Sequence, residues 1–170
     1  MQIFGLAGWS GSGKTTLMTA LIPEFVSRGM TVSTIKHAHH SFDIDQPGKD
    51  SWQHREAGAQ EVMVASGRRW ALMHELRGTI EPSLDELLTR MKPVDLLLVE
   101  GFKHHDHPKI EIYRHGLGKP LLHPDDPFIV AIASDHWRAE FSRPWLPLSD
   151  AAAIASFILG QEAGPVRCHS

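Results

Sequence analysis

The sequence contains one cysteine, Cys168, among its 170 residues. A single cysteine excludes an intramolecular disulfide framework and suits a reducing compartment, so we expect a cytoplasmic protein. The chain also lacks an excess of positive charge, since 17 Lys+Arg against 20 Asp+Glu give a formal net charge of −3. A general nucleic-acid binder needs a basic surface to displace counterions from phosphates, so the composition argues against nucleic acid as a partner.

Long apolar runs are missing as well. No stretch approaches the roughly 20 apolar residues of a membrane span, and the N-terminus lacks the basic start and cleavage site of a signal peptide. We therefore expect no membrane segment. Hydrophobic residues still make up 42% of the chain. A chain of this length buries about 70% of its unfolded surface, which is enough for one core without disulfide or metal support.

The first third of the chain has the pattern of an α/β protein. The apolar run 2–7 is bounded by Gly8 and is typical of a strand buried on both faces. Helical periodicity follows from Lys14 to Gly29, and four of the five residues 31–35 are β-branched, as in a strand. A strand, a helix and a strand in this order predict a βαβ unit and hence a parallel sheet.

A phosphate-binding motif connects the first strand to the helix. Residues 8–15, Gly-Trp-Ser-Gly-Ser-Gly-Lys-Thr, match the P-loop or Walker A pattern G-x-x-x-x-G-K-[ST] without a mismatch. The glycines allow backbone torsions that turn successive N–H groups toward phosphates, at a helix N-terminus whose dipole favours anions. We expect Lys14 to reach the β- and γ-phosphates and the Thr15 hydroxyl to bind Mg²⁺.

A P-loop needs a second acidic group for Mg²⁺, and two carboxylates flank the most apolar strand pattern, 95–101. Glu100 follows four apolar residues and lies at the carboxyl end, where ligands of parallel sheets gather. Asp95 lies at the entrance of the same strand and is predicted to point away from the P-loop. Lys14 and Glu100 are therefore the candidate catalytic residues, and Thr15 and Glu100 the candidate metal ligands.

Selection of the base is predicted from the end of another buried strand, 128–133. Asp135 follows this strand, and a carboxylate there can accept hydrogen bonds from the N1–H and 2-amino group of guanine, which adenine does not offer. The alternative is an aspartate that begins a turn. Asp150 is more simply explained as the cap of a final helix.

Two segments predict strands outside the minimal nucleotide-binding sheet. Residues 61–66 and 69–75 are separated by a short turn and predict a hairpin, and the alternating residues 109–114 predict an edge strand. The expected fold is a three-layer α/β P-loop NTPase with a mostly parallel sheet and an extra β-hairpin segment. We expect a single domain over 1–160 with a β-rich insertion around 61–76 and 109–114, and a flexible tail over 161–170.

The sequence has 12 histidines, and several cluster in two loops. Neutral imidazoles at short spacing can bind Zn²⁺ or Ni²⁺, although no cysteine accompanies them. The alternative is a set of surface histidines near a nucleotide. The loop 37–50, with Lys36 before it and Asp43 and Asp45 within it, is interpreted as a switch-like loop beside the γ-phosphate. The clusters are His37, His39 and His40, and His104, His105 and His107.

Five segments together resemble the MobB family of molybdopterin-guanine dinucleotide biosynthesis adaptor proteins. The P-loop alone indicates only an NTPase, and the Lys-His-x-His-His and Pro-Gly-Lys-Asp-Ser segments make the resemblance specific. It runs from Ile3 to about Phe157 and covers nearly the whole chain. The five segments are residues 7–16, 35–40, 47–51, 69–73 and 98–103.

This resemblance implies a GTP-binding homodimer with weak GTPase activity, which assists the guanylyltransferase that attaches GMP to molybdopterin. GTP and Mg²⁺ are the implied cofactors, with Glu100 near Mg²⁺ and Asp135 toward guanine. The loop 37–50 would face the partner or molybdopterin. The implied nucleotide site consists of Gly11, Ser12, Gly13, Lys14, Thr15, Thr16 and Asp135.

Two other functions fit parts of the sequence. A small-metabolite P-loop kinase would share the phosphate site, but the sequence has no lid-like insertion and its one Arg pair, Arg68-Arg69, lies at the predicted hairpin turn. A metallochaperone GTPase would use the histidine loops. ATP-dependent phosphoryl transfer would distinguish the first alternative, and stoichiometric binding of Ni²⁺ or Zn²⁺ the second.

Overall fold

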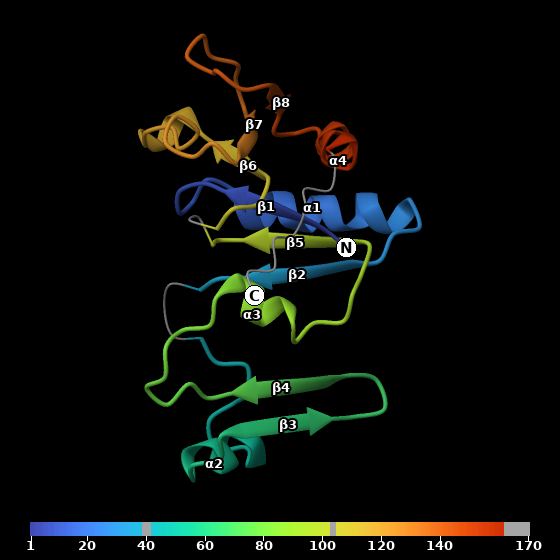
Figure 1. Cartoon of the computed structure of the whole chain (residues 1–170), viewed down its shortest axis with the longest axis vertical. Helices are drawn as coiled ribbons and strands as arrows, with labels where there is room; N and C mark the ends of the chain where they lie inside the picture. Colours follow the sequence, from blue (N-terminus) through green and yellow to red (C-terminus); the bar gives the residue numbers. More distant parts are fainter. Residues whose placement is uncertain (39–41, 103–104, 162–170) are drawn as a thin grey trace. The chain divides into compact units, whose positions relative to one another are not determined.

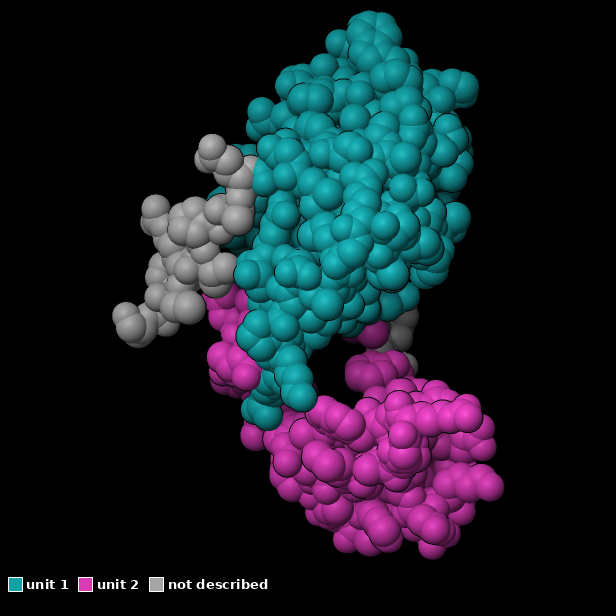
Figure 2. All heavy atoms as spheres, turned by 90° about the vertical axis from the view of Figure 1, so that its right-hand side faces the viewer, with its two compact units in different colours: residues 1–37, 90–170 teal, residues 38–89 magenta. Residues whose placement is uncertain are grey.

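The computed structural model describes residues 1–38, 42–102 and 105–161 (Figure 1). Contacts divide the chain into two compact units, which Figure 2 colours separately. Unit 1 comprises residues 1–37 and 90–170, and unit 2 comprises residues 38–89. Of the predicted tail 161–170, all but Gln161 lies outside the described residues.

Unit 1 is built on a six-stranded sheet whose strands run in the order β2-β5-β1-β6-β7-β8, with every pairing parallel. The predicted α/β fold with a mostly parallel sheet is therefore confirmed. The strands are β1 (Gln2–Ala7), β2 (Val32–Lys36), β5 (Leu96–Glu100), β6 (Lys109–Tyr113), β7 (Ile129–Ser134) and β8 (Trp145–Pro147).

Two helices pack on one face of this sheet and form the main core. They are α1 (Lys14–Ser27) and α4 (Ala151–Gly160), and Asp150 caps α4 by accepting a hydrogen bond from the Ala153 amide at 2.9 Å, as predicted. A short 3-10 helix, η1 (His115–Leu117), follows β6. The core side chains are Phe4, Leu6, Leu17, Met18, Leu21, Phe25, Leu96, Leu98, Ile110, Ile112, Ala131, Ala133, Ile154, Ala155 and Ile158.

The prediction for residues 109–114 is wrong. β6 is an interior strand between β1 and β7, and all its residues are buried. The alternation of charged and apolar residues indicated a half-solvated edge, but both charged side chains have buried partners. Lys109 donates to Asp126 at 2.7 Å, and Glu111 accepts from the backbone amides of Leu122 and His123 at 2.7 and 2.9 Å. Paired charges can be buried, and here they let a polar strand enter the sheet.

Unit 2 contains the predicted hairpin, an antiparallel pair of β3 (Glu61–Ala65) and β4 (Trp70–His74). Val62 and Met73 face each other across the pair and are buried, whereas the neighbouring pair Met63 and Leu72 is exposed. Two short helices complete the unit, α2 (Asp50–Glu56) and α3 (Leu84–Leu88). The insertion is thus confined to unit 2, because residues 109–113 belong to the main sheet.

No helix among the described residues combines the length and the apolar character needed to cross a bilayer.

Candidate functional site

The P-loop lies between β1 and α1, where the sequence predicts it. Gly8 and Gly13 have φ values of +151° and +101°, a region that side chains disfavour. A Cβ on Gly8 would also lie 2.7 Å from the Ile112 carbonyl oxygen and 2.7 Å from Ser12 Oγ. Both positions therefore require glycine, and the turn they allow brings the loop back to the N-terminus of α1.

Two polar side chains of the P-loop, those of Lys14 and Ser12, lie against its backbone. The Lys14 ammonium donates to the carbonyl oxygens of Gly8 and Trp9, both at 2.9 Å, so the cation lies over the loop. Ser12 is 1% exposed, and its Oγ has no hydrogen-bond partner among the described residues. A buried hydroxyl without a partner costs free energy, so the loop holds one hydrogen-bonding group ready for a ligand.

The predicted metal ligands meet at the carboxyl edge of the sheet. β5 pairs with β1, and Glu100 is the last residue of β5. The Thr15 hydroxyl donates to the two carboxylate oxygens of Glu100 at 3.1 and 3.4 Å. Lys36 Nζ lies 3.8 Å from the same carboxylate, and Glu100 is 8% exposed. Thr16 follows in the first turn of α1 and is exposed.

This donor pair fits Mg²⁺. The ion prefers hard oxygen ligands, and two oxygens bound to it side by side at about 2.0–2.1 Å lie roughly 3 Å apart. The 3.1 Å between Thr15 Oγ1 and Glu100 Oε1 has this spacing. Mg²⁺ in nucleotide sites takes few protein ligands and completes its shell with phosphate and water. Thr15 and Glu100 are the residues that would hold it.

A tight turn follows Glu100. Gly101 and Phe102 have φ values of +99° and +48°, and a Cβ on Gly101 would lie 2.6 Å from the Cβ of His37. The His37 amide donates to the Glu100 carbonyl at 2.8 Å, and its ring lies 4.7 Å from that of Phe102. The start of the predicted switch-like loop is therefore attached to the strand that ends in Glu100.

The rest of that loop belongs to unit 2. Asp43 and Asp45 pair with Arg55 at 2.8 and 2.9 Å, so their carboxylates brace α2. His39 and His40 lie outside the described residues, as does His104 of the second cluster. No group of three or more His, Cys, Asp or Glu with the geometry of a metal site is found in the part of the chain that the structure describes.

Asp135 lies at the same edge of the sheet, directly after β7, and its side chain is 36% exposed. The neighbouring strand β6 is followed by Arg114, a neighbour of the P-loop that was not predicted from the sequence. Arg114 Nε donates to the Ser12 carbonyl of the P-loop at 3.0 Å, and Nη1 lies 3.9 Å from the Asp135 carboxylate. Its position at the end of a strand could have indicated a site residue. The prediction of an edge strand over 109–114 placed this end away from the P-loop.

The P-loop is also contacted by the segment after β6. The indole N–H of Trp9 donates to the Pro120 carbonyl at 2.8 Å, and Lys119 Nζ lies 5.7 Å from the centroid of the Trp9 ring system. The indole of Trp9 is thus held against this segment rather than left as a free surface group.

Asp95 has the structural role that its place in the sequence predicts. It is exposed at the start of β5 and accepts hydrogen bonds from the Thr31 amide and hydroxyl at 2.8 and 2.7 Å. These bonds lower the pKa of the Asp95 carboxyl below its ordinary value, because they stabilise the charged form. Asp95 therefore joins β5 to the segment before β2 and does not face the P-loop.

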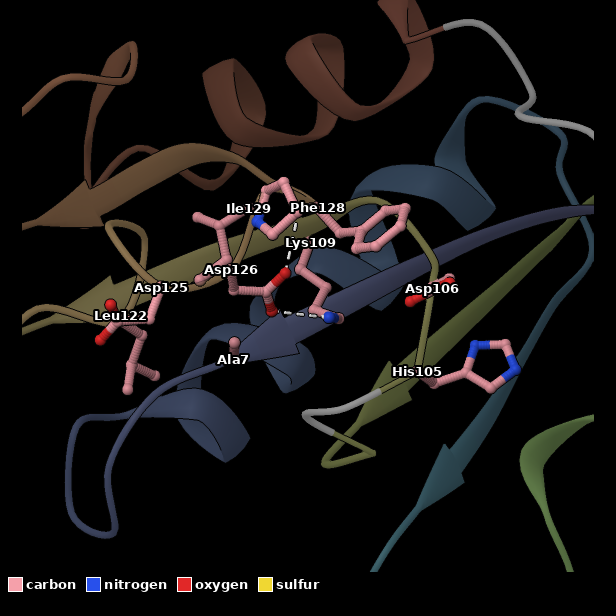
Figure 3. Close-up of a pocket in the computed structure, with 10 residues that line it drawn as sticks. Ala7, His105, Asp106, Lys109, Leu122, Asp125, Asp126, Phe128 and Ile129 are labelled. Carbon is pink, nitrogen blue, oxygen red and sulfur yellow. Dashed lines mark hydrogen bonds and ion pairs between the residues drawn. The ribbon is translucent and has the colours of Figure 1, made fainter.

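A cavity of about 310 Å³ lies beside the start of the P-loop, because Ala7, the residue before Gly8, lines it (Figure 3). The Lys109–Asp126 ion pair stands in its wall, with Phe128 beside it. His107 is buried nearby, and burial, helped by the charge of Lys109, lowers the pKa of its imidazole to about 3. The lining residues are Ala7, His105, Asp106, Lys109, Leu122, Asp125, Asp126, Pro127, Phe128 and Ile129.

Comparisons with known proteins agree on one family. Residues 3–135 match the family model MobB, described as molybdopterin guanine dinucleotide synthesis protein B. A molybdopterin-guanine dinucleotide biosynthesis adapter protein of Haemophilus influenzae is 42% identical over 160 residues, 93% of this chain and 88% of that protein. Its counterpart in Escherichia coli is 42% identical over 162 residues, 94% of this chain and 92% of that protein.

Solved structures show the same fold. A crystal structure of a molybdopterin-guanine biosynthesis protein B is similar with a TM-score of 0.69 and 26% identity, covering 92% of this chain and 97% of that one. The crystal structure of Bacillus subtilis MobB gives a TM-score of 0.70 at 24% identity, with 94% and 96% covered.

Proposed function

Because the chain belongs to the MobB family, we propose that it is a GTP-binding adaptor in the biosynthesis of molybdopterin-guanine dinucleotide. The observation that supports nucleotide binding most directly is the meeting of Thr15 with Glu100 at 3.1 Å beside Lys14. A P-loop, its lysine and a hydroxyl–carboxylate pair form the usual binding site for a nucleoside triphosphate with Mg²⁺.

Each residue has a distinct part in this proposal. The P-loop amides from Gly11 to Thr16 surround the phosphates, and Lys14 neutralises charge on the β- and γ-phosphates. Thr15 and Glu100 hold Mg²⁺, which neutralises further phosphate charge when bound. Asp135 accepts hydrogen bonds from the guanine edge. Its exposed carboxylate at the carboxyl end of β7 supports this role, because ligands of open α/β sheets bind at that edge.

We expect hydrolysis of GTP to be slow. A fast GTPase needs a side chain that orients the attacking water. The carboxylate nearest to Thr15 is Glu100, and it already accepts from Thr15 and pairs with Lys36. Bound GTP would therefore persist, which suits an adaptor that presents a nucleotide-bound surface to another protein.

The proposed partner is the guanylyltransferase that joins GMP to molybdopterin, in the cytoplasm. Both close relatives carry the name adapter protein, which describes an assisting role rather than the transfer itself. The segment from His37 onward supports contact with that partner or with molybdopterin, because it begins at the Glu100 turn and continues into unit 2.

We also propose a homodimer formed through the hairpin. Met63 and Leu72 are paired in register, as are Ala65 and Trp70, so these four side chains share one face. Trp70 is 61% exposed and Met63 is 62% exposed. An isolated two-stranded hairpin is marginally stable in water, and an apolar face of this kind is normally covered. A second copy of the chain is the proposed cover.

Equilibrium binding of GTP and ATP with Mg²⁺ tests the nucleotide proposal. Wild type is expected to prefer GTP, Lys14→Ala to lose at least tenfold in affinity for both nucleotides, and Asp135→Asn to lose the preference. Lys92→Ala and Asp125→Asn are the matched controls, since both residues are exposed and neither belongs to the P-loop. A preference for ATP would contradict the proposal and favour a metabolite kinase.

The adaptor proposal is tested separately. Transfer of GMP to molybdopterin by a purified guanylyltransferase is measured with and without this protein. Wild type is expected to raise the yield of the dinucleotide, and Lys14→Ala is expected not to. An equal effect of both proteins would mean that assistance does not depend on bound GTP.

A further inference from the structure

Arg114 occupies the only position from which one side chain contacts both the P-loop and Asp135 among the described residues of this edge. β6 lies between β1, which leads into the P-loop, and β7, which leads into Asp135. Tyr113 pairs with Ser134 in the sheet, so the next residue of each strand, Arg114 and Asp135, emerges side by side.

The contacts of Arg114 use different nitrogens of its guanidinium. Nε donates to the Ser12 carbonyl at 3.0 Å, and Nη1 lies 3.9 Å from an oxygen of Asp135. Nη2 lies 3.4 Å from the point that a Cβ on Gly13 would occupy. A planar guanidinium offers five N–H groups in a fixed fork on three separate nitrogens, so it can hold two partners at a set spacing, whereas the three N–H groups of a lysine share one nitrogen.

We infer that Arg114 is a positioning residue that links the P-loop to Asp135 and thereby sets the selectivity for guanine. This inference rests on the proposed binding of GTP. The side chains of Arg114 and Asp135 are 42% and 36% exposed, so the pair restrains the carboxylate while leaving it open to a ligand. A carboxylate already held toward the base loses less rotational freedom when the N1–H and 2-amino group bind.

Through Arg114, binding of the phosphates also affects the position of Asp135. Any shift of the Ser12 carbonyl when phosphates enter the loop reaches Asp135 through the planar guanidinium that contacts both. The phosphate part and the base part of the site are therefore coupled, and the coupling is carried by Arg114. A surface ion pair alone adds little energy, so the expected effect is on selectivity rather than on folding.

Inosine triphosphate separates this role from a general support of the P-loop, because its base lacks only the 2-amino group of guanine. We would measure the affinities for GTP, inosine triphosphate and ATP with Mg²⁺ for wild type, Arg114→Met and Arg114→Lys. The ratio of the GTP to the inosine triphosphate affinity is expected to fall about fivefold in both variants. Arg28→Met is the control, since Arg28 contacts α4 at the far end of α1.

Thermal unfolding of each variant shows that it is folded, and Arg114→Lys retains the charge in case Arg114→Met does not fold. In the Asp135→Asn background, Arg114→Met is expected to leave the ratio unchanged, because the carboxylate it positions is gone. If Arg114→Met lowers all three affinities by the same factor, Arg114 merely supports the P-loop and the inference is overturned. If wild type itself does not distinguish the three nucleotides, the proposed binding of guanine fails first.

Discussion

The two units differ in how their strands are covered. In unit 1 the strands β5 and β6 are buried along their whole length, and α1 and α4 cover one face of their sheet. In unit 2, β3 and β4 pair only with each other among the described strands, and only Val62 and Met73 of their apolar side chains are buried. Unit 1 therefore supplies its own stability, whereas the hairpin of unit 2 presents apolar surface that a partner can bury.

The largest expected effect is in the core of unit 1. Leu98 is fully buried in the centre of β5, so Leu98→Ala removes apolar contacts and leaves a cavity. We expect a loss of about 3–4 kcal/mol in the free energy of unfolding, measured by urea denaturation. Leu72→Ala in the hairpin is the matched change, because Leu72 is 39% exposed. It is expected to cost less than about 1 kcal/mol. Equal costs would contradict the difference between the units.

The second effect concerns association rather than folding. Met63→Ser combined with Trp70→Ser removes two exposed apolar side chains from the hairpin face. If this face joins two copies, the dissociation constant of the dimer is expected to rise on the order of a hundredfold, equivalent to about 2.7 kcal/mol. Sedimentation over a range of concentrations measures it. Ile80→Ser is the control, since Ile80 is 93% exposed and lies off both strands.

An unchanged dimer in the double variant would show that the hairpin face is not the interface. A protein that is monomeric at every concentration would remove the homodimer from the proposal. The binding of GTP is expected to survive the double variant, because the P-loop belongs to unit 1.

The contrast between the units also explains what the sequence allows to be predicted. The P-loop and Glu100 are local patterns, a glycine-rich turn before a helix and a carboxylate after four apolar residues. The hairpin is local too, because a short turn between two strand patterns fixes its pairing. Each of these depends on neighbours in the chain, and each is found where it was predicted.

The prediction of β6 as an edge strand was wrong because its burial depends on residues distant in the sequence. The alternating pattern predicts that Lys109 and Glu111 are exposed, but partners distant in the sequence, Asp126 for Lys109 and the amides of Leu122 and His123 for Glu111, let them be buried. With β6 assigned to an edge, nothing pointed to Arg114 as a neighbour of the P-loop. Trp70 is 61% exposed, because its face of the hairpin has no cover from the described residues of unit 2.

The third effect is a pH dependence of stability that arises from a buried histidine in unit 1. His107 is 4% exposed in unit 1, and burial lowers its pKa to about 3, against about 6.5 in an unfolded chain. Between pH 3 and pH 6.5, His107 is protonated in the unfolded state and neutral in the folded state. The contribution of His107 to the free energy of unfolding is therefore fully present above pH 6.5. It falls as the pH is lowered, by about 2 kcal/mol between pH 7 and pH 5.

His107→Leu removes this titration, so its unfolding free energy is expected to depend less on pH than that of wild type over the same interval. Urea denaturation at pH 7, 6 and 5 measures the slopes. His54→Leu is the control, because His54 is an exposed histidine on α2. Parallel slopes for wild type and His107→Leu would show that His107 takes up its proton in the folded protein.

The smallest effect tests whether unit 2 is stabilised locally where it lacks a large core. Ser83 begins α3 with a capping box, in which its hydroxyl accepts from the Glu86 amide at 3.2 Å and its own amide donates to the Glu86 carboxylate at 2.8 Å. Ser83→Ala is expected to lower the stability of this helix by about 1 kcal/mol, because the Glu86 amide loses its partner. Hydrogen exchange of the α3 amides measures that loss without requiring unit 1 to unfold. Ser83→Ala is expected to speed exchange in α3 and to leave β5 and β6 unchanged, and equal acceleration in both units would mean that they unfold as one.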